Sequence, residues 1–292
     1  MALQSMKTML AAAREGRYGV AAFNIVDYNS TRAVVRAAEE LNAPVIVQVS
    51  VKTVRFWGSA AIVAWVRQLA SDSPVPVSLH LDHCKDLDVI RECIAAGWTD
   101  VMIDASHKPF EENLSLTREV VAMATEAGVG VEAELGQIRG VEEDKRVDDD
   151  QAHLADPDKA VLFCRDLPLA VFAPAIGTAH GLYKGEPKIA FDRLEQIACR
   201  TGLPIALHGG AGLSDEVFRK CIALGCAKIN ISTQLKHTFI DSFVEYHVAH
   251  HEYEPLKPLG AQFERMKNEV KEKITLFGSS GRAASAGSAA VE

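Results

Sequence analysis

Short apolar runs alternate with amphipathic stretches along most of the chain. The runs are nearly continuous in apolar residues, which is typical of strands that are buried on both faces of a parallel sheet. We therefore predict eight strands, at Tyr18–Asn24, Pro44–Ser50, Pro76–Leu81, Asp100–Ile103, Val129–Leu135, Leu169–Gly177, Leu203–Leu207 and Ala227–Ile231.

A helix is predicted after each of these strands. The predicted helices are Ser30–Leu41, Ser59–Ala70, Leu87–Ala96, Glu111–Ala127, a short helix ending near Cys164, Phe191–Thr201, Ser214–Leu224 and Gln234–His250. The polar stretch Gly136–Asp156 between the fifth strand and the short helix is predicted to be a loop. Eight successive strand–helix units predict an α/β protein with one (β/α)8 barrel.

Both ends of the chain extend beyond the predicted barrel. Residues 1–16 have the pattern of an amphipathic helix, and a further helix is predicted around Gly260–Thr275. The length of 292 residues suits one barrel of roughly 250 residues plus such extensions. We expect a single barrel domain over residues 1–282 and a disordered tail over residues 283–292, where small residues dominate.

The charge and composition of the chain argue against nucleic acids and membranes as partners. The net charge is −8 and no run of lysine and arginine occurs, which argues against nucleic acid. No apolar run approaches 18 residues and no signal peptide is apparent, so we expect no membrane span. The six cysteines are scattered without metal-binding spacing, which is typical of reduced thiols in a cytoplasmic protein.

Polar side chains gather at the carboxyl ends of the predicted strands, where barrels of this kind build their active sites. Three of them are histidines from three different strands, His83, His180 and His208. Three imidazoles with an open fourth position form the pattern of a catalytic zinc site. Asp104 and Glu134 end two further strands, and we expect them to orient these histidines or to act as alternative ligands.

A phosphate site is predicted beside this metal site. The segment LHGGAG at 207–212 places a glycine-rich turn after His208 and before a helix, and such turns let backbone N–H groups approach an anion. Barrels often bind phosphate with the loops after strands seven and eight. The loop after strand eight carries Ser232 and Thr233, whose hydroxyls can also contact a phosphate.

The motifs resemble those of the zinc-dependent class II ketose-bisphosphate aldolases, the family of the fructose- and tagatose-bisphosphate enzymes. The resemblance runs from about Ser5 to Arg282 and implies a (β/α)8 barrel with Zn²⁺ held by the three histidines. It further implies that Asp82 is the acid/base aspartate and that Glu142, in GVEED, moves a proton at a substrate carbon. The motifs that carry it are AFN at 22–24, APVIVQVS at 43–50, LHLDH at 79–83, MIDAS at 102–106, VEAELG at 131–136, GTAHG at 177–181, LHGGAG at 207–212 and KINIST at 228–233.

The same resemblance implies a site for dihydroxyacetone phosphate and a small phosphorylated sugar as the substrate. It also implies a monovalent cation, Na⁺ or K⁺, near the carbonyls of Gly181 and Gly209, and a homodimer or homotetramer. Three positions depart from the family pattern and bear on the substrate: Ala211 replaces a serine, Arg139 replaces a glycine, and Ser232 stands at a variable position. The substrate-binding residues that we expect are Asn24, Ser50, Ser106, Gly181, Lys184, Gly209, Gly210, Ala211, Asn230, Ser232 and Thr233.

Cations far from the metal site would bind a second phosphate. Lys52 and Arg55 follow the second strand. Arg282 lies in FGSSGR, which resembles a terminal segment that contacts the active site in some relatives, sometimes from a neighbouring subunit. Arginine binds phosphate through two parallel hydrogen bonds. We therefore predict cleavage of a ketose 1,6-bisphosphate to dihydroxyacetone phosphate and an aldehyde such as glyceraldehyde 3-phosphate.

Four alternatives remain open from the residues alone. A ketose 1-phosphate aldolase would need no distal cation. Lys228, a lysine within a predicted buried strand, suggests a Schiff-base aldolase that works without metal. Three histidines and a carboxylate could also activate water in a zinc hydrolase. A barrel without catalytic activity is the fourth alternative, although a structural role requires neither metal ligands nor an acidic loop.

Overall fold

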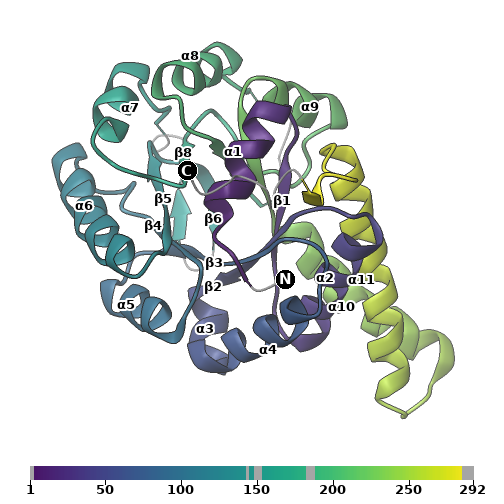
Figure 1. Cartoon of the computed structure of the whole chain (residues 1–292). Helices are drawn as coiled ribbons and strands as arrows, with labels where there is room; N and C mark the ends of the chain where they lie inside the picture. The colour runs from purple at the N-terminus through teal and green to yellow at the C-terminus, as the bar shows by residue number, and fades with distance from the viewer. Residues whose placement is uncertain (1–2, 143–144, 148–152, 182–187, 285–292) are drawn as a thin grey trace.

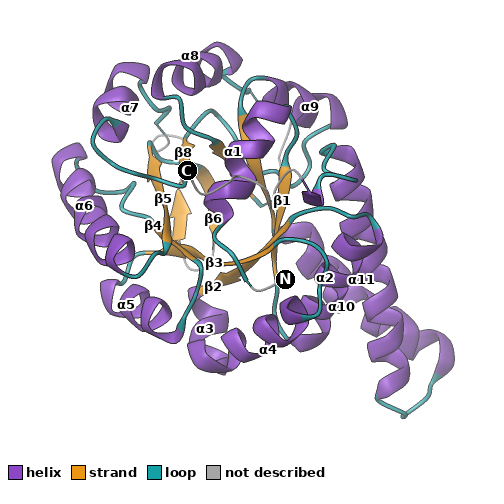
Figure 2. Cartoon of the chain, in the orientation of Figure 1, coloured by secondary structure: helices purple, strands orange, loops and turns teal. Residues whose placement is uncertain are grey.

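The computed structural model describes residues 3–142, 145–147, 153–181 and 188–284, without the side chains of residues 139, 141, 142 and 145–147. Eight parallel strands close into a barrel in the order β1-β11-β10-β8-β5-β4-β3-β2, with helices around it (Figure 1, Figure 2). The (β/α)8 prediction is confirmed. The barrel strands are β1 Val20–Asn24, β2 Val45–Ser50, β3 Val77–Cys84, β4 Asp100–Ile103, β5 Gly130–Leu135, β8 Val171–Pro174, β10 Ile205–Leu207 and β11 Cys226–Ile231.

The outer helices begin and end within two residues of the bounds that their periodicity predicts. Their apolar faces pack on the outward-facing side chains of the strands and form the larger core. An additional short helix, α3 (Val51–Trp57), follows β2 and was not predicted. The outer helices are α2 Tyr28–Glu40, α4 Ser59–Ser71, α5 Leu87–Ala96, α6 Phe110–Glu126, α7 Pro157–Cys164, α8 Phe191–Thr201, α9 Asp215–Ala223 and α10 Thr233–His250, and α11 Leu256–Leu276 packs on α10 and α2.

Helix α1 (Met6–Gly16) covers the amino ends of the strands, where Figure 1 shows it crossing the barrel. Its apolar side chains Met6, Met9 and Leu10 enter a second core cluster inside the barrel. Asp100 anchors its start, because this buried carboxylate accepts hydrogen bonds from Ser5 Oγ at 2.6 Å and from the Met6 backbone N–H at 2.9 Å. The amino end is therefore closed, and only the carboxyl end of the barrel can admit a ligand.

Residues 136–156 differ from the predicted loop. They contain the strands β6 (Arg139–Glu142) and β7 (Lys145–Val147), and β6 also pairs with the short strand β9 (Ala179–His180). Gly140 makes this pairing possible, because a Cβ at its position would lie 2.2 Å from the carbonyl oxygen of His180. The strands of this small sheet lack the apolar pattern of the barrel strands, which is why the sequence analysis missed them.

The chain remains packed slightly beyond the predicted start of the tail. Ala283 is buried, and its backbone N–H donates to the carbonyl of Asn42. The expected tail therefore begins after Ala283, and residues 285–292 lie outside the described part of the chain.

Candidate active site

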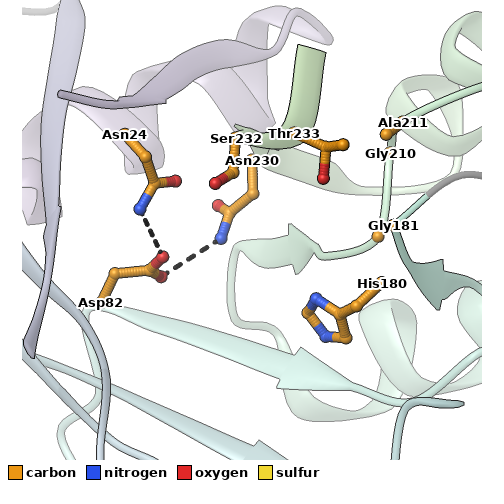
Figure 3. Close-up of a pocket in the computed structure, with 10 residues that line it drawn as sticks. Asn24, Asp82, His180, Gly181, Gly210, Ala211, Asn230, Ser232 and Thr233 are labelled. Atoms are coloured by element: carbon orange, nitrogen blue, oxygen red, sulfur yellow. Dashed lines mark hydrogen bonds between the residues drawn. The ribbon is translucent and has the colours of Figure 1, made fainter. Parts of the chain in front are cut away.

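A pocket opens at the carboxyl end of the barrel (Figure 3). Its volume is about 320 Å³ with its open mouth included, which is at the lower end of the range for small-molecule sites. All ten lining residues are ones that the sequence analysis assigned to catalysis, metal binding or substrate binding. They are Asn24, Asp82, His180, Gly181, Gly209, Gly210, Ala211, Asn230, Ser232 and Thr233.

An irregularity at the end of β3 brings two consecutive side chains into this site. Consecutive residues of a regular strand point to opposite faces, so Asp82 and His83 would be separated. Between Leu81 and Cys84, however, β3 has one residue more than its partner β4, and His83 has a φ of 47°. Such a bulge re-aims a side chain. Both side chains are consequently buried on the same side, with His83 Nε2 4.0 Å from Asp82 Oδ1.

The three predicted histidine ligands converge. The ring of His83 lies 5.2 Å from that of His180 and 4.5 Å from that of His208, measured between centroids. One potential ligand atom from each of the three histidines lies within 4.8 Å of the other two. His83, Asp104 and Glu134 form a second group whose potential ligand atoms are equally close. The five residues predicted from the sequence as metal ligands therefore form two overlapping groups that share His83.

Two buried atoms show that the residues fit a metal ion. His208 Nδ1 and Glu134 Oε2 lie 3.4 Å apart, and neither has a hydrogen-bond partner beyond this long contact among the described residues. Leaving such atoms unsatisfied is costly in a protein interior. A cation bound at the histidines would satisfy both atoms, and imidazole and carboxylate are ordinary ligands of a divalent metal.

Asp82 is held on both of its carboxylate oxygens. Asn24 Nδ2 donates to Oδ2 at 2.8 Å, and Asn230 Nδ2 donates to Oδ1 at 3.4 Å, as the dashed lines in Figure 3 show. Burial raises the pKa of the carboxyl, but the charges of His83 and Lys228 outweigh burial, and the net pKa lies below its ordinary value. Asp82 is therefore an ionised carboxylate at the pocket wall, ready to accept a proton.

The two loops that the sequence predicts as a phosphate site also line the pocket. Gly209 has a φ of 69°, and a Cβ there would lie 2.5 Å from the carbonyl oxygen of Ala179, so only glycine fits. Ser232 and Thr233 begin α10, and no side chain caps the first turn of this helix. Uncapped N–H groups at a helix N-terminus attract anions. The turn before α9, in contrast, is capped by the Ser214 side chain.

Comparison with known proteins identifies this arrangement. The profile of the family described as "Fructose-bisphosphate aldolase class-II" matches residues 4–282. The chain belongs to this family. It is therefore a class II aldolase, a carbon–carbon lyase of carbohydrate metabolism, and its class implies a divalent metal.

Relatives support the assignment over the full length. The aldolase is 43% identical over 287 residues to the fructose-bisphosphate aldolase of Staphylococcus aureus, covering 97% of this chain and 100% of the relative. It is 38% identical over 291 residues to the sulfofructosephosphate aldolase of Alkalicoccus urumqiensis, covering 97% and 99%. The YdjI aldolase of Escherichia coli K12 has the same fold, with a TM-score of 0.86, 31% identity and coverage of 96% and 99%.

Glu132 is a residue of the aldolase site that the sequence analysis missed. Its Oε1 lies 2.7 Å from His208 Nε2, and its Oε2 lies 2.8 Å from Lys228 Nζ. Burial raises the pKa of Glu132, but Lys228 and His208 lower it well below its ordinary value. The available signal was strand alternation, because Glu132 has the same parity in β5 as Glu134 and must face the same side.

His208 is strongly affected by its carboxylate neighbours. Burial and His83 lower the pKa of His208, but the hydrogen bond to Glu132 and the proximity of Glu134 raise it, to about 9. For His80, which lies 3.3 Å from Glu132, burial prevails and lowers the pKa to about 3. Without a bound metal, an additional proton therefore occupies the imidazole of His208, one of the predicted metal ligands, while His80 stays neutral.

Lys228 does not line the pocket. It is fully buried, pairs with Glu132 and donates to Asn230 Oδ1 at 2.8 Å. An ammonium held in an ion pair is a poor nucleophile, since a Schiff-base lysine must lose its proton. This geometry argues against the Schiff-base alternative for the aldolase.

Several predicted site residues lie outside the pocket wall. Ser106 donates to Asp104 at 2.6 Å and so supports that carboxylate, and Ser50 accepts from the Thr53 N–H as the cap of α3. Arg55 lies at the rim but pairs with Asp86 at 3.2 Å. The side chain of Glu142 and the whole of Lys184 lie outside the described part of the aldolase.

Arg282 lies away from the pocket of its own chain. Its guanidinium lies over the ring of Tyr18, 5.5 Å from the centroid, and Tyr18 precedes β1. Neighbouring Gly281 donates to the carbonyl of Leu41, which precedes β2. Arg282 therefore lies at the amino ends of the strands and does not reach the pocket of its own chain.

Proposed function

We propose that this aldolase catalyses the zinc-dependent, reversible cleavage of a ketose 1,6-bisphosphate of the fructose or tagatose type. The products are dihydroxyacetone phosphate and an aldehyde such as glyceraldehyde 3-phosphate. One observation supports the proposal: one pocket is lined by His180 of the three-histidine cluster, by the ionised Asp82 and by Ser232 and Thr233 at the uncapped start of α10.

His83, His180 and His208 would hold the zinc ion, with Asp104 and Glu134 beside them as further carboxylates. When bound, zinc supplies Lewis-acid stabilisation of the negative charge that develops at the carbonyl oxygen during cleavage. Two additional carboxylates make the site strongly anionic, which favours a divalent cation over a neutral ligand.

Asp82 would act as the general base. In cleavage it takes the proton of the C4 hydroxyl, the C3–C4 bond breaks, and C4 leaves as an aldehyde while the electron pair passes to the enediolate. In the reverse direction Asp82 returns that proton to the aldehyde oxygen. Asn24 and Asn230 hold both carboxylate oxygens at the pocket wall, which fixes the position from which the proton is taken.

Glu142 would complete the reaction by delivering a proton to C3 of the enediolate, which gives dihydroxyacetone phosphate. The pairing of backbones supports this role. Glu142 ends β6, and Gly140 of the same strand pairs with the metal ligand His180. The glutamate is therefore carried by a strand attached to the rim of the site, and such an arrangement suits a segment that closes over substrate.

The substrate phosphate would lie against the backbone N–H groups of Gly209, Gly210 and the first turn of α10. Ala211 lacks the hydroxyl that its position usually supplies in the family, so backbone groups and Thr233 carry the contact. Carbonyls of Gly181 and Gly209 would hold a monovalent cation, Na⁺ or K⁺, near this phosphate.

A ketose 1-phosphate is the second candidate substrate. Among the described residues, no lysine or arginine lines the pocket, and Arg55 is paired with Asp86. A third possibility is a sulfonate at the distal end, since a relative is named sulfofructosephosphate aldolase. All three substrates would share the same dihydroxyacetone phosphate half.

A substrate panel tests the proposal. Fructose and tagatose 1,6-bisphosphate, the matching 1-phosphates and sulfofructose 1-phosphate are assayed for release of dihydroxyacetone phosphate, with and without a chelator. We expect cleavage of a bisphosphate that the chelator abolishes and zinc restores. Full activity in the chelator, together with a borohydride-trapped adduct on Lys228, would replace this proposal by the Schiff-base mechanism.

We also propose a single-domain, cytoplasmic enzyme that forms a homodimer or homotetramer. Helix α10 exposes Ile240, Val244 and Val248, at 58%, 52% and 63%. Their spacing places them on one face of the helix, and we call these three residues the α10 stripe. Exposed apolar stripes of this kind are typical of protein–protein contacts. Within the described residues, no helix is long and apolar enough to cross a membrane.

A further inference from the structure

A cluster of buried titratable side chains contacts the pocket wall through Asn230. Lys228, Glu132 and His80 are all fully buried inside the barrel, and none of them lines the pocket. Charges are rarely placed in an interior without a role, because desolvation is costly even for a well-made ion pair. The contacts of this cluster lead to two groups that the proposed reaction uses.

The first contact determines which nitrogen of His208 carries a hydrogen. The Glu132 carboxylate pairs with the Lys228 ammonium through Oε2 at 2.8 Å, and its Oε1 lies 2.7 Å from His208 Nε2, where it can accept a hydrogen bond. The hydrogen of a neutral His208 imidazole must therefore sit on Nε2. This leaves the lone pair on Nδ1, the atom that lies 3.4 Å from Glu134 Oε2 on the side of the metal ligands.

The second contact determines the orientation of the Asn230 amide. An amide can present either its oxygen or its nitrogen, but an ammonium can only donate. Lys228 Nζ donates to Asn230 Oδ1 at 2.8 Å, so the amide oxygen must face Lys228. The amide nitrogen then faces Asp82 and donates to its Oδ1 at 3.4 Å.

We propose that Glu132 and Lys228 are positioning residues of this aldolase: the ion pair fixes the metal-binding nitrogen of His208 through Glu132 and the orientation of Asn230, and thereby Asp82, through Lys228. The inference rests on the proposed function, since it assigns these residues to the metal ligand and the general base of that reaction. The 2.8 Å contact between Glu132 and Lys228 joins the two halves, so one buried pair sets the relative placement of metal ligand and base.

Zinc affinity tests the Glu132 half. Glu132→Gln introduces an amide that can also donate, so the hydrogen on His208 Nε2 is no longer enforced. We expect zinc affinity, measured by competition with a chelator, to fall about 10- to 100-fold, the usual loss when the partner of a ligating histidine is removed. Glu269→Gln is the matched control, because Glu269 is a buried glutamate on α11, outside the pocket. Unchanged zinc affinity in Glu132→Gln would overturn this half.

A double-mutant cycle at saturating zinc tests the Lys228 half. We expect Lys228→Met to lower kcat about 10- to 100-fold with little change in KM, because small misplacements of catalytic groups have effects of this size. In an Asn230→Ala background the same substitution should lower kcat less than about twofold, since Lys228 acts through Asn230. Lys228→Arg keeps the donors and should retain most of kcat. Equal losses in both backgrounds would show that Lys228 does not position Asn230.

Two features keep these outcomes distinct. Lys228→Met leaves Glu132 buried without its cation, so the neutral pair Glu132→Gln/Lys228→Met replaces it in the cycle if the single variant does not fold. The zinc-affinity measurement uses no substrate. Wild-type protein that binds zinc but cleaves no ketose phosphate would therefore contradict the proposed function, while the positioning of His208 would still be tested.

Discussion

If His208 is a metal ligand, as proposed, it must lose a proton before the metal binds, and metal binding then depends on pH. The pKa of this imidazole is about 9 in the metal-free fold, against an ordinary 6.5. Because the folded state holds the proton more tightly than the unfolded chain, the contribution to stability is present below pH 6.5 and is lost as the pH rises through about 9. A metal that displaces the proton removes this dependence.

We therefore expect apparent zinc affinity to rise by about tenfold per pH unit between pH 7 and 9, with release of about one proton per zinc ion bound. Chelator competition across this range gives the affinity, and calorimetry in buffers of different ionisation enthalpy gives the proton count. An affinity that is flat from pH 7 to 9 would show that His208 is already neutral in the metal-free protein.

Substitution of Asp82 should affect the cleavage rate without affecting the binding of zinc or of dihydroxyacetone phosphate. Asp82→Ala removes the base but leaves the three histidines, so it should keep about one zinc ion per chain and still bind dihydroxyacetone phosphate. Cleavage should fall by roughly two or more orders of magnitude, as is usual when a general acid–base is removed. Metal analysis, ligand binding and rate are measured on the same preparation. Loss of zinc from Asp82→Ala would make the role of this residue structural.

Replacing Gly209 by alanine tests whether the loop after β10 must pack closely against β9. Gly209 has the same φ, 69°, as Gly202, but a Cβ at Gly202 would meet nothing within 4 Å, whereas at Gly209 it would meet the backbone of Ala179. Gly202→Ala should cost only the left-handed conformation, about 1 kcal/mol of unfolding free energy. Gly209→Ala should cost more and should also weaken dihydroxyacetone phosphate binding.

Denaturant unfolding of the two alanine variants checks this prediction, with the difference between them as the result. Equal losses of stability would mean that β9 and the loop after β10 can separate without cost. In that case the close contact between Gly209 and Ala179 would not be what holds the phosphate loop beside His180.

The elements that the sequence predicts well are those whose pattern arises from burial. Barrel strands and outer helices bury an apolar face against each other, so their positions follow from periodicity, and their carboxyl ends then place the polar residues of the pocket. The hairpin of β6 and β7 has no such face. Its pairing depends on the close approach at Gly140, a tertiary contact that the sequence does not display.

Side-chain directions were predictable only where strands are regular. Parity along β5 and β11 puts Glu132 with Glu134 and Lys228 with Asn230, so the buried pair could have been inferred before the structure. At the end of β3, the bulge interrupts the alternation of side-chain directions, and no sequence pattern predicts the positive φ of His83. Arg282 was placed from its motif, which cannot show that the segment returns to the amino ends of the strands.

At the scale of the whole molecule, the α10–α11 hairpin extends away from the barrel (Figure 1). If the α10 stripe forms a contact between copies, Val244→Glu should place a charge in that contact and reduce the oligomer to smaller species. Light scattering after size exclusion measures the mass. Leu162→Glu on α7, where the leucine is 48% exposed, is the matched control and should leave the mass unchanged. An unaltered mass in Val244→Glu would exclude the stripe as an interface.

The arrangement of strands around the barrel determines where the far end of a substrate must lie. In the closed order, β3 lies directly across the barrel from β10, whose loop forms part of the proposed phosphate site. A ketose whose phosphate rests there extends towards the rim of β2 and β3. Arg55 follows β2, and its partner Asp86 follows β3. A distal phosphate would thus compete with Asp86 for the Arg55 guanidinium.

A phosphate can displace Asp86 from Arg55 because both side chains are exposed, and a surface ion pair contributes only about 0–1 kcal/mol. Arginine, in contrast, binds a phosphate with two hydrogen bonds. Arg55→Ala should therefore raise KM for a ketose 1,6-bisphosphate about 10-fold, the loss of one charge-assisted contact, and leave KM for the 1-phosphate nearly unchanged. Arg282→Ala is the control, since Arg282 lies at the opposite end of its own barrel. A rise in KM for Arg282→Ala would indicate that this arginine acts on a neighbouring subunit, and equal efficiency of wild type on both substrates would identify a 1-phosphate aldolase.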